Sequence, residues 1–289
     1  MLRLWRLHRV RHRARRRVAD RARRRQPGHG PRPESGRGGA GRDHAAPDTR
    51  RGVHVKLRCR STKLGKVRFT SHRDAARIWE RALRRAELPV AATEGFTPRP
   101  KISFGLALPT GAESIAEYVD IELREDAADV DLDALPERLS TALPTGFDVL
   151  VVAERHQGTA SLQEAVTSVT WELWAPDLDR DAHIDACRLL DADVLELERE
   201  RKGKRSVDDV RPMILEAQPT ATDDRLVIRL ATVGRALRPA EFARLAYPDL
   251  DPVLVRALRT HQWIDCDGQP EELLPLPAGL DARPVEVLA

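Results

Sequence analysis

Residues 53–88 have the sequence VHVKLRCRSTKLGKVRFTSHRDAARIWERALRRAEL, the stretch in which the first strand and the first helix can be recognised. In residues 53–60 apolar and polar side chains alternate, which is the pattern of a half-buried strand. Ser71 is of a type that caps helix N-termini, and Asp74 follows three positions later, as in a capping box. The stretch therefore predicts a strand followed by a helix that runs to about Glu87.

The predicted helix has two different faces, because successive side chains are rotated by about 100° around a helix axis. The apolar face consists of Ala75, Ile78, Trp79, Ala82, Leu83 and Ala86. The opposite face is basic and consists of Arg73, Arg77, Arg81 and Arg84. We expect the apolar face to pack on the sheet, which leaves the arginines at the surface.

Strands and helices follow one another in a similar order in both halves of the chain. In the first half, strand patterns cover residues 101–108, 116–125 and 147–155, with a helix at about 131–142. In the second half, strand patterns cover 166–175, 193–201, 224–232 and 261–267, and helices are expected at 178–190, 239–246 and 252–260. This order predicts an α+β fold of tandem ferredoxin-like β-α-β-β sandwiches with antiparallel sheets.

Four segments differ in composition. Residues 1–52 contain 17 Arg and 4 Asp or Glu without hydrophobic periodicity, so a disordered Arg-rich tail is expected there. Either this tail binds RNA or DNA through its charge, or it is a mis-annotated start that is not translated. The remaining segments are predicted as a basic N-terminal α+β module at 53–160, an acidic C-terminal α+β module at 161–270, and a tail at 271–289.

The charge of the chain is unevenly distributed beyond the tail as well. Residues 53–105 hold 13 Lys or Arg against 4 Asp or Glu, whereas residues 106–289 hold 19 against 37. A basic module fits nucleic acid or another polyanion as a partner. An acidic module is more often a solvated surface.

Composition also indicates the cellular setting. No apolar run approaches the roughly 20 residues that span a bilayer, and the N-terminus has no apolar signal-peptide core. Cys59, Cys187 and Cys266 are isolated from one another, which argues against disulfides and against a zinc or iron–sulfur site. We therefore expect a soluble cytoplasmic protein with no metal, no cofactor and no membrane partner. Phosphate-binding loops, hydrolase elbows and metalloprotease motifs are also missing from the sequence.

The most distinctive string is EGFTPRPKISFG at residues 94–105. Two prolines restrict its backbone, Arg99 and Lys101 add positive charge, and Phe96 and Phe104 add aromatic rings. Cations beside aromatic rings on a rigid loop suit the recognition of single-stranded RNA. The alternative is that both rings belong to the core and the loop is only a rigid connector.

The string FTSHRD at residues 69–74 puts His72 and Arg73 in the first turn of the predicted helix. A helix N-terminus with these side chains attracts anions, and a histidine can also act as an acid or base. Alternatively, His72 is a structural or surface residue. Together with Glu94 it makes a conceivable acid–base pair.

A third basic segment, ERKGKRSVDDVRP at residues 200–212, includes Lys204 and Arg211. It predicts a charged hairpin tip within an acidic module. Such a tip is either solvated, or it supplies an anion contact that faces the first module across a cleft.

These strings are similar to the signature of an uncharacterised radical-SAM-linked protein family. In that family a block like RFTSH precedes a helix and a string like SEGFxPRPKISFGPALPxG, and KGKRSVDDVRP is similar to a later segment; the similarity extends over about residues 53–266. The resemblance implies association with cobalamin-binding-type radical SAM proteins, and gene neighbourhood with a ribonuclease of the E/G type. The chain lacks the C-x-x-x-C-x-x-C motif, so it would be the partner of the radical enzyme.

Three hypotheses for function follow. The first is a non-catalytic RNA-binding or substrate-presenting accessory domain that acts with a radical SAM enzyme. The second is a protein–protein adaptor without RNA binding, and the third is an enzyme that uses His72 and Glu94. The candidate nucleic-acid or anion-binding residues are His72, Arg73, Arg77, Arg81, Phe96, Arg99, Lys101, Lys204 and Arg211; none is assigned a catalytic role.

Overall fold

The computed structural model describes residues 55–127, 130–155, 160–201, 203–221, 224–234 and 236–277. The predicted tail at 1–52 lies outside these residues. We call residues 55–160 the first half and residues 161–277 the second half. Within the described residues, no helix is both long enough and apolar enough to cross a membrane.

The described residues of the first half form two α-helices and four strands. In chain order they are β1 (Lys56–Lys63), α1 (His72–Arg85), β2 (Ile102–Phe104), β3 (Glu113–Glu122), α2 (Leu135–Ala142) and β4 (Val149–Glu154), and a 3-10 turn, η1 (Gly65–Phe69), precedes α1.

The second half contains the remaining elements. They are α3 (Leu162–Ala165), β5 (Val166–Trp174), α4 (Arg180–Cys187), η2 (Arg188–Asp191), β6 (Glu196–Arg201), β7 (Lys204–Asp209), η3 (Arg211–Met213), β8 (Ile214–Pro219), β9 (Leu226–Ala231), α5 (Pro239–Ala246), β10 (Arg256–Cys266) and β11 (Gln269–Glu272).

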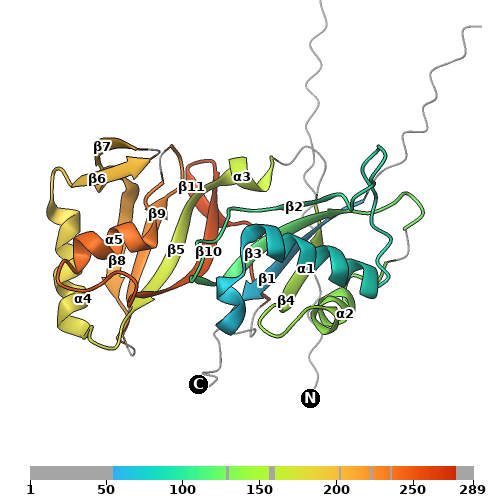
Figure 1. Ribbon diagram of the computed structural model, residues 1–289, viewed down its shortest axis with the longest axis horizontal. Helices are drawn as coiled ribbons and strands as arrows, with labels where there is room; N and C mark the ends of the chain where they lie inside the picture. The colour runs from blue at the N-terminus through green and yellow to red at the C-terminus, as the bar shows by residue number, and fades with distance from the viewer. Residues whose placement is uncertain are drawn as a thin grey trace, which may run out of the picture. The chain divides into compact units, whose positions relative to one another are not determined.

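One nine-stranded sheet runs through both halves (Figure 1). Its order is β4-β1-β3-β10-β5-β9-β8, with β2 paired to β3 and β11 paired to β10. Neighbouring strands of the described sheet are antiparallel, apart from a short parallel contact that joins Leu258 and Arg259 of β10 to Glu113 and Ser114 of β3. The α+β class and the antiparallel pairing are therefore confirmed, and the sheets of the two halves are joined.

The same connections occur in both halves. In the first, β1-α1-β2-β3-α2-β4 produces the order β4-β1-β3-β2. In the second, β5-α4-β8-β9-α5-β10 produces the order β10-β5-β9-β8, and the separate β6–β7 hairpin is inserted after α4. The last of these strands, β10, lies between the halves, where it contacts β3.

The prediction of a helix at residues 252–260 is wrong. Strand β10 begins at Arg256 and pairs with β5 as far as Ile264. The reason is tertiary: β10 occupies the place between β3 and β5, where its backbone polar groups find partners on neighbouring strands. This gain outweighs the local preference of the segment.

Helix α1 begins where the sequence predicts. The hydroxyl of Ser71 accepts a hydrogen bond from the backbone N–H of Asp74 at 3.2 Å, and it donates to the Asp74 carboxylate at 2.7 Å. Trp79, Ala82 and Leu83 are buried. The predicted division into an apolar and a basic face is therefore confirmed.

Each half has a hydrophobic core beneath its helices. The first core combines β1, β3, α1 and α2, with Leu57, Trp79, Val119, Ile121 and Leu139 among its buried members. The second combines β5, β9, α4 and α5, with Trp171, Leu173, Ala186, Ile228 and Phe242 among its buried members.

Successive side chains of β1 and β3 lie on opposite sides of the sheet. Cys59 and Val119 pack in the first core with α1, and burial raises the pKa of the Cys59 thiol to about 12. Arg58 and Asp120 lie on the other side and pair with each other. We call these two sides of the first half the α1 face and the far face.

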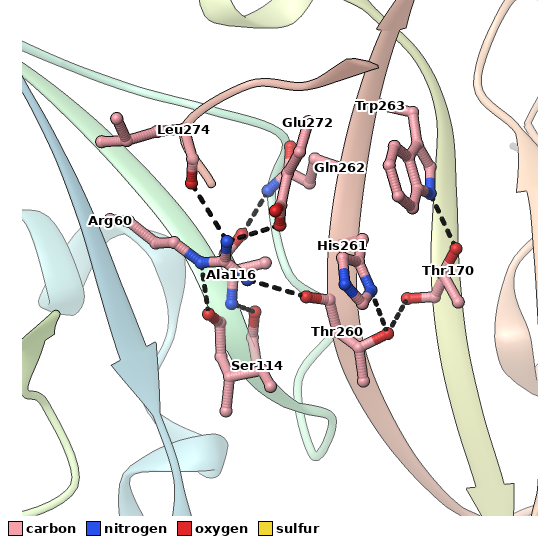
Figure 2. A network of polar contacts seen from close by, with 11 residues as sticks. Arg60, Ser114, Ala116, Thr170, Thr260, His261, Gln262, Trp263, Glu272 and Leu274 are labelled. Atoms are coloured by element: carbon pink, nitrogen blue, oxygen red, sulfur yellow. Dashed lines mark hydrogen bonds and ion pairs between the residues drawn. The ribbon is translucent and has the colours of Figure 1, made fainter. Parts of the chain in front are cut away.

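Arg60 connects the two halves on the far face (Figure 2). Its side chain, 1% exposed, donates from Nε to the carbonyl of Ile115 at 3.0 Å and from Nη2 to that of Thr260 at 3.1 Å. It also donates to the carbonyl of Leu274 at 3.0 Å and pairs with Glu272. One buried cation therefore links β1, β3, β10 and the segment that follows β11.

That C-terminal segment belongs to the folded structure. Residues 271 and 272, where the sequence predicts the start of a tail, complete β11. Leu273 and Leu274 pack against a small cluster that includes Tyr118 and Leu162. The segment thus covers part of the far face beside the junction.

Candidate functional site

Residues 93–99 form an exposed loop, and the rest of the string EGFTPRPKISFG includes the short strand β2. The loop is closed at its base, because the N–H of Thr93 donates to the carbonyl of Arg99 at 2.8 Å and the N–H of Arg99 donates to Oγ1 of Thr93 at 3.1 Å. Gly95 has φ of 127°, which favours glycine. Phe96 is fully exposed, at 111% of its reference area, and Arg99 is exposed as well.

The two phenylalanines of this string have different environments. Phe104 packs against the first core, together with Ile102, whereas Ser103 is exposed. Ile102 and Phe104 therefore lie on the opposite side of β2 from Ser103, as the period of two in a strand requires. Phe96 lies outside every core cluster, so the interpretation that both rings are core holds only for Phe104.

A pocket of about 290 Å³ lies at the base of the loop, on the far face. Lys101 lies in its wall and pairs with Glu122, Nζ to Oε1 at 2.9 Å. The other oxygen of Glu122 lies 3.3 Å from Nζ of Lys56. Both lysine side chains remain about 40% exposed, at 39% and 42%, so their ammonium groups reach solvent.

A second shared carboxylate adjoins the first. Asp120 accepts two hydrogen bonds from Arg58, at 2.7 and 2.9 Å, and lies 3.1 Å from Nη1 of Arg155. The pocket therefore brings together two carboxylates, each shared by two cations, and it keeps a surplus of positive charge. Such a surplus attracts an anion. The hydroxyl-bearing residues Thr93 and Ser103 also line it.

The charge arrangement acts on the pKa of Glu122. Partial burial acts to raise this pKa. The hydrogen bonds from Lys101 and Lys56 lower it by more than burial raises it, so the pKa lies below its usual value. The carboxylate is therefore held in its charged form beside the two lysines.

The basic row of α1 is on the other side of the sheet. Arg73, Arg77 and Arg81 are exposed on the outer surface of α1, and Arg77 pairs with Asp74 at 3.2 Å. Among the described residues no ion pair involves Arg73 or Arg81. Phe96 and Arg99 thus lie on the loop that leads into Lys101, whereas the α1 arginines lie on the other side of the sheet from Lys101.

His72 lines a different and much smaller cavity, of about 30 Å³, on the α1 face. Its ring makes an edge-to-face contact with the ring of Phe104, with centroids 5.5 Å apart. Ser61, Lys63 and Glu117 also line this cavity, which has room for a water molecule but not for a substrate. Glu94 lies in the exposed loop, and in the described residues no hydrogen bond joins it to His72.

The remaining predicted residues lie in the second half. Lys204 begins β7, and its side chain is outside the described part of the structure. Arg211 donates from Nε and Nη2 to the carbonyl of Leu190, at 3.1 and 2.7 Å, and from Nη1 to that of Ile214 at 2.9 Å. Its guanidinium thus fastens η2 to β8.

Sequence reasoning missed Lys56 and Arg155 as members of the pocket. The alternation in β1 marks Lys56 as polar, but only the register of β1 with β3 puts it opposite Glu122. Arg155 follows β4, which pairs with the other edge of β1, so no local motif connects it with Lys101.

The fold and the site define an α+β protein with a cation-rich pocket beside an exposed aromatic loop. In the described residues no three His, Cys, Asp or Glu side chains gather as metal ligands. The chain belongs to the family of uncharacterized proteins conserved in bacteria (DUF2344), which matches residues 56–239. No curated protein matches the chain. The matched region includes the loop and the pocket, and it ends before β10 and β11.

Proposed function

We propose that this chain is a non-catalytic accessory domain that binds single-stranded RNA and presents it to a partner enzyme. The observation that carries the proposal is the fully exposed ring of Phe96 on a closed loop, whose end residues Thr93 and Pro100 line the cationic pocket. We call Phe96, Arg99, Lys101, Lys56 and Arg155 the loop–pocket surface. An exposed ring can stack on a base while the cations contact phosphates.

The closed base of the loop supports this function. Pro98 and Pro100 restrict the backbone, and two hydrogen bonds join Thr93 to Arg99. A preorganised loop loses little conformational entropy when a ligand binds. Because the ring of Phe96 is not part of a core cluster, it is available to bind a ligand.

The sheet of the first half does not offer the same chemistry. In RNA-recognition motifs, aromatic side chains on a four-stranded sheet stack the bases. Here β1, β2, β3 and β4 contain two aromatic residues: Tyr118, which is 2% exposed in the cluster with Leu162, and Phe104, which packs against the first core. Between these strands and the loop, base stacking thus falls to Phe96, and the far face contributes charge.

We further propose that each half is a ferredoxin-like unit. The strand orders β4-β1-β3-β2 and β10-β5-β9-β8, with one crossover helix in each split β-α-β connection, support this interpretation. The parallel contact between β3 and β10 would then join two such units edge to edge.

The proposed partner enzyme is a radical SAM protein. The similarity of residues 94–105 and 200–212 to the radical-SAM-linked family supports this partner, and a ribonuclease of the E/G type is a further candidate on the same ground. RNA is the substrate class that the loop–pocket surface favours.

The test is RNA binding by paired variants of the full chain. Fluorescence anisotropy with labelled oligouridine, at increasing salt, compares wild type with Lys56→Gln/Lys101→Gln and with Phe96→Ala. We expect the lysine variant to flatten the slope of log affinity against log salt by roughly 1.4, for two lost contacts to a single strand. Phe96→Ala should weaken binding by about tenfold, since one stacked base contributes ~1–3 kcal/mol.

The matched control is Arg73→Gln/Arg81→Gln, which removes two exposed charges from the α1 face. The 17 arginines of residues 1–52 are present in every variant, so any binding by them is a background common to all arms of the comparison. Equal losses for both double variants would mean diffuse charge attraction without a site. Wild-type affinity in the lysine variant and in Phe96→Ala would contradict the proposal.

A protein–protein adaptor is the second candidate. The acidic excess of residues 106–289 and the exposed Val253 and Leu254, at 86% and 52%, favour it. If the wild type binds no oligouridine at low salt, the adaptor becomes the better hypothesis.

A further inference from the structure

The pocket at the base of the loop lies over β3, which pairs with β2 on one side and with β1 on the other. Residues 120–122 of β3 line it from below, residues 100–103 line it from the side of β2, and Lys56 lines it from the side of β1. Its volume of about 290 Å³ is at the lower end of the range for small-molecule pockets. The pocket can therefore admit the phosphate and sugar of one nucleotide but not a length of strand.

The charges at this pocket do not balance. Four cations and two carboxylates line the pocket or pair with its lining: Lys56, Arg58, Lys101 and Arg155 against Asp120 and Glu122. On the adjoining loop, the exposed Arg99 and Glu94 carry opposite charges and cancel each other. Among the described residues, four positive charges against two negative ones leave a surplus of two at the pocket.

The two lysines are held where they can contact one ligand together. Nζ of Lys56 and Nζ of Lys101 lie 3.3 and 2.9 Å from the two oxygens of Glu122, so one carboxylate keeps both ammonium groups close to each other. An ammonium group has three donors, so each lysine keeps donors for a ligand after it has bonded to Glu122. A group with several acceptor oxygens can thus bridge the two lysines.

Two hydroxyl groups add further donors. Oγ1 of Thr93 accepts a hydrogen bond from the N–H of Arg99 at 3.1 Å, and its own hydrogen can still be donated. Ser103 is exposed, and among the described residues its hydroxyl has no hydrogen-bond partner. Ammonium and hydroxyl donors together suit the oxygens of a phosphate group.

The phosphates of an RNA strand differ in charge. A phosphate inside the strand carries one negative charge, whereas a terminal phosphate monoester carries close to two at neutral pH and has three free oxygens. We propose that the pocket binds the terminal phosphate of an RNA strand, whose charge matches the surplus of two. This inference rests on the proposed function, because it specifies which part of the RNA the pocket receives. The base that stacks on Phe96 would then belong to a nucleotide next to that end.

The experiment is a competition in which unlabelled ligands displace the labelled oligouridine from the full chain. The competitors are pentauridine with a 5′-phosphate, pentauridine with a 3′-phosphate, and heptauridine with hydroxyl groups at both ends. Well above the second pKa of the phosphate, about 6, the heptauridine has the same total charge as either pentamer, so it controls for charge alone. We expect one of the phosphorylated pentamers to bind about tenfold more tightly than the heptauridine, which identifies the end that the pocket receives.

Variants locate this preference in the pocket. It should be lost in Lys56→Gln/Lys101→Gln, and also in Ser103→Ile, which fills space at an exposed position without changing charge. Phe96→Ala should weaken all three competitors by a similar factor and keep the preference, because a stacked base does not report the charge of the end. The control Arg73→Gln/Arg81→Gln, on the α1 face, should keep the wild-type preference.

The possible failures of the two proposals differ. If the wild type binds the heptauridine as tightly as both phosphorylated pentamers, this inference is overturned and RNA binding stands. A preference that persists in Lys56→Gln/Lys101→Gln overturns it as well, because the terminal phosphate is then held elsewhere. If no oligouridine binds, the proposed function fails, and this inference fails with it.

Discussion

The ammonium group of Lys101 lies 2.9 Å from Oε1 of Glu122, across the pair formed by β2 and β3. Lys56 approaches the other oxygen of the same carboxylate at 3.3 Å. The face on which Lys101 lies follows from strand alternation, but its partner does not. Because a single carboxylate is shared by two lysines, the group of three side chains keeps a positive charge and can still contact a phosphate.

The first prediction concerns Lys101→Ala. Lys101 is 39% exposed, and exposed ion pairs contribute little, so the free energy of unfolding should change by no more than about 0.5 kcal/mol. The pKa of Glu122 should rise, because a group that lowers it is removed. Urea unfolding and an NMR titration of the glutamates measure both effects. An unfolding free energy lower by ~2 kcal/mol would mean that Lys101 is structural.

The second prediction compares Phe96 with Phe104. Phe96→Ala should change the unfolding free energy by no more than about 0.5 kcal/mol, because the ring is fully exposed. Phe104 is partly buried against the first core, so Phe104→Ala should cost about 2 kcal/mol, below the ~3–5 kcal/mol of a fully buried ring. Urea unfolding of both variants tests this difference. Equal losses of unfolding free energy would contradict the different environments of the two rings.

The third prediction concerns Gly146, which has φ of 95°. A Cβ there would lie 2.4 Å from the carbonyl oxygen of Leu64, which is backbone and cannot move aside. Gly146→Ala should therefore cost several kcal/mol, on the order of 3 or more. The control is Gly268→Ala: φ there is 80°, but a Cβ meets nothing within 4 Å, so the cost should stay near about 1 kcal/mol. Thermal melts of both variants test the difference.

The fourth prediction concerns the buried cation that joins the halves. Arg60→Met removes the partner of Glu272 and the donors to three carbonyls, so it should cost about 3–5 kcal/mol. Hydrogen exchange should also show loss of protection in β11. Arg205→Met, at a side chain 73% exposed, is the control and should stay within about 0.5 kcal/mol of wild type. Normal protection of β11 in Arg60→Met would show that the strand is held by other contacts.

The fifth prediction concerns pH. Burial, together with the charge of Arg60, lowers the pKa of His261 from 6.5 to about 4. The unfolded chain therefore binds a proton on this group as pH falls below 6.5, while the folded protein does not until about pH 4. The contribution of His261 to stability is thus present at neutral pH and is lost as pH falls toward 4. Urea unfolding at pH 7.5 and pH 5 should show a smaller difference in His261→Gln than in wild type.

The sequence was sufficient for the local features of this protein. The alternation in residues 53–60 predicts β1, Ser71 and Asp74 predict the start of α1, and the apolar face of α1 predicts its contact with the first core. These features are decided within a few residues by capping and periodicity, so a single sequence reveals them. The α+β class follows from the order of such elements.

Only the tertiary structure decided which distant segments pair with one another. β10 becomes a strand because it lies between β3 and β5, and Arg60 finds its partners in β3, β10 and the segment after β11. The cationic pocket likewise depends on register, which puts Lys56 opposite Glu122 and Arg155 beside Asp120. A strand pattern specifies which face a side chain takes, but the neighbour across the sheet is set by chain topology and by the packing of both cores, to which the whole chain contributes.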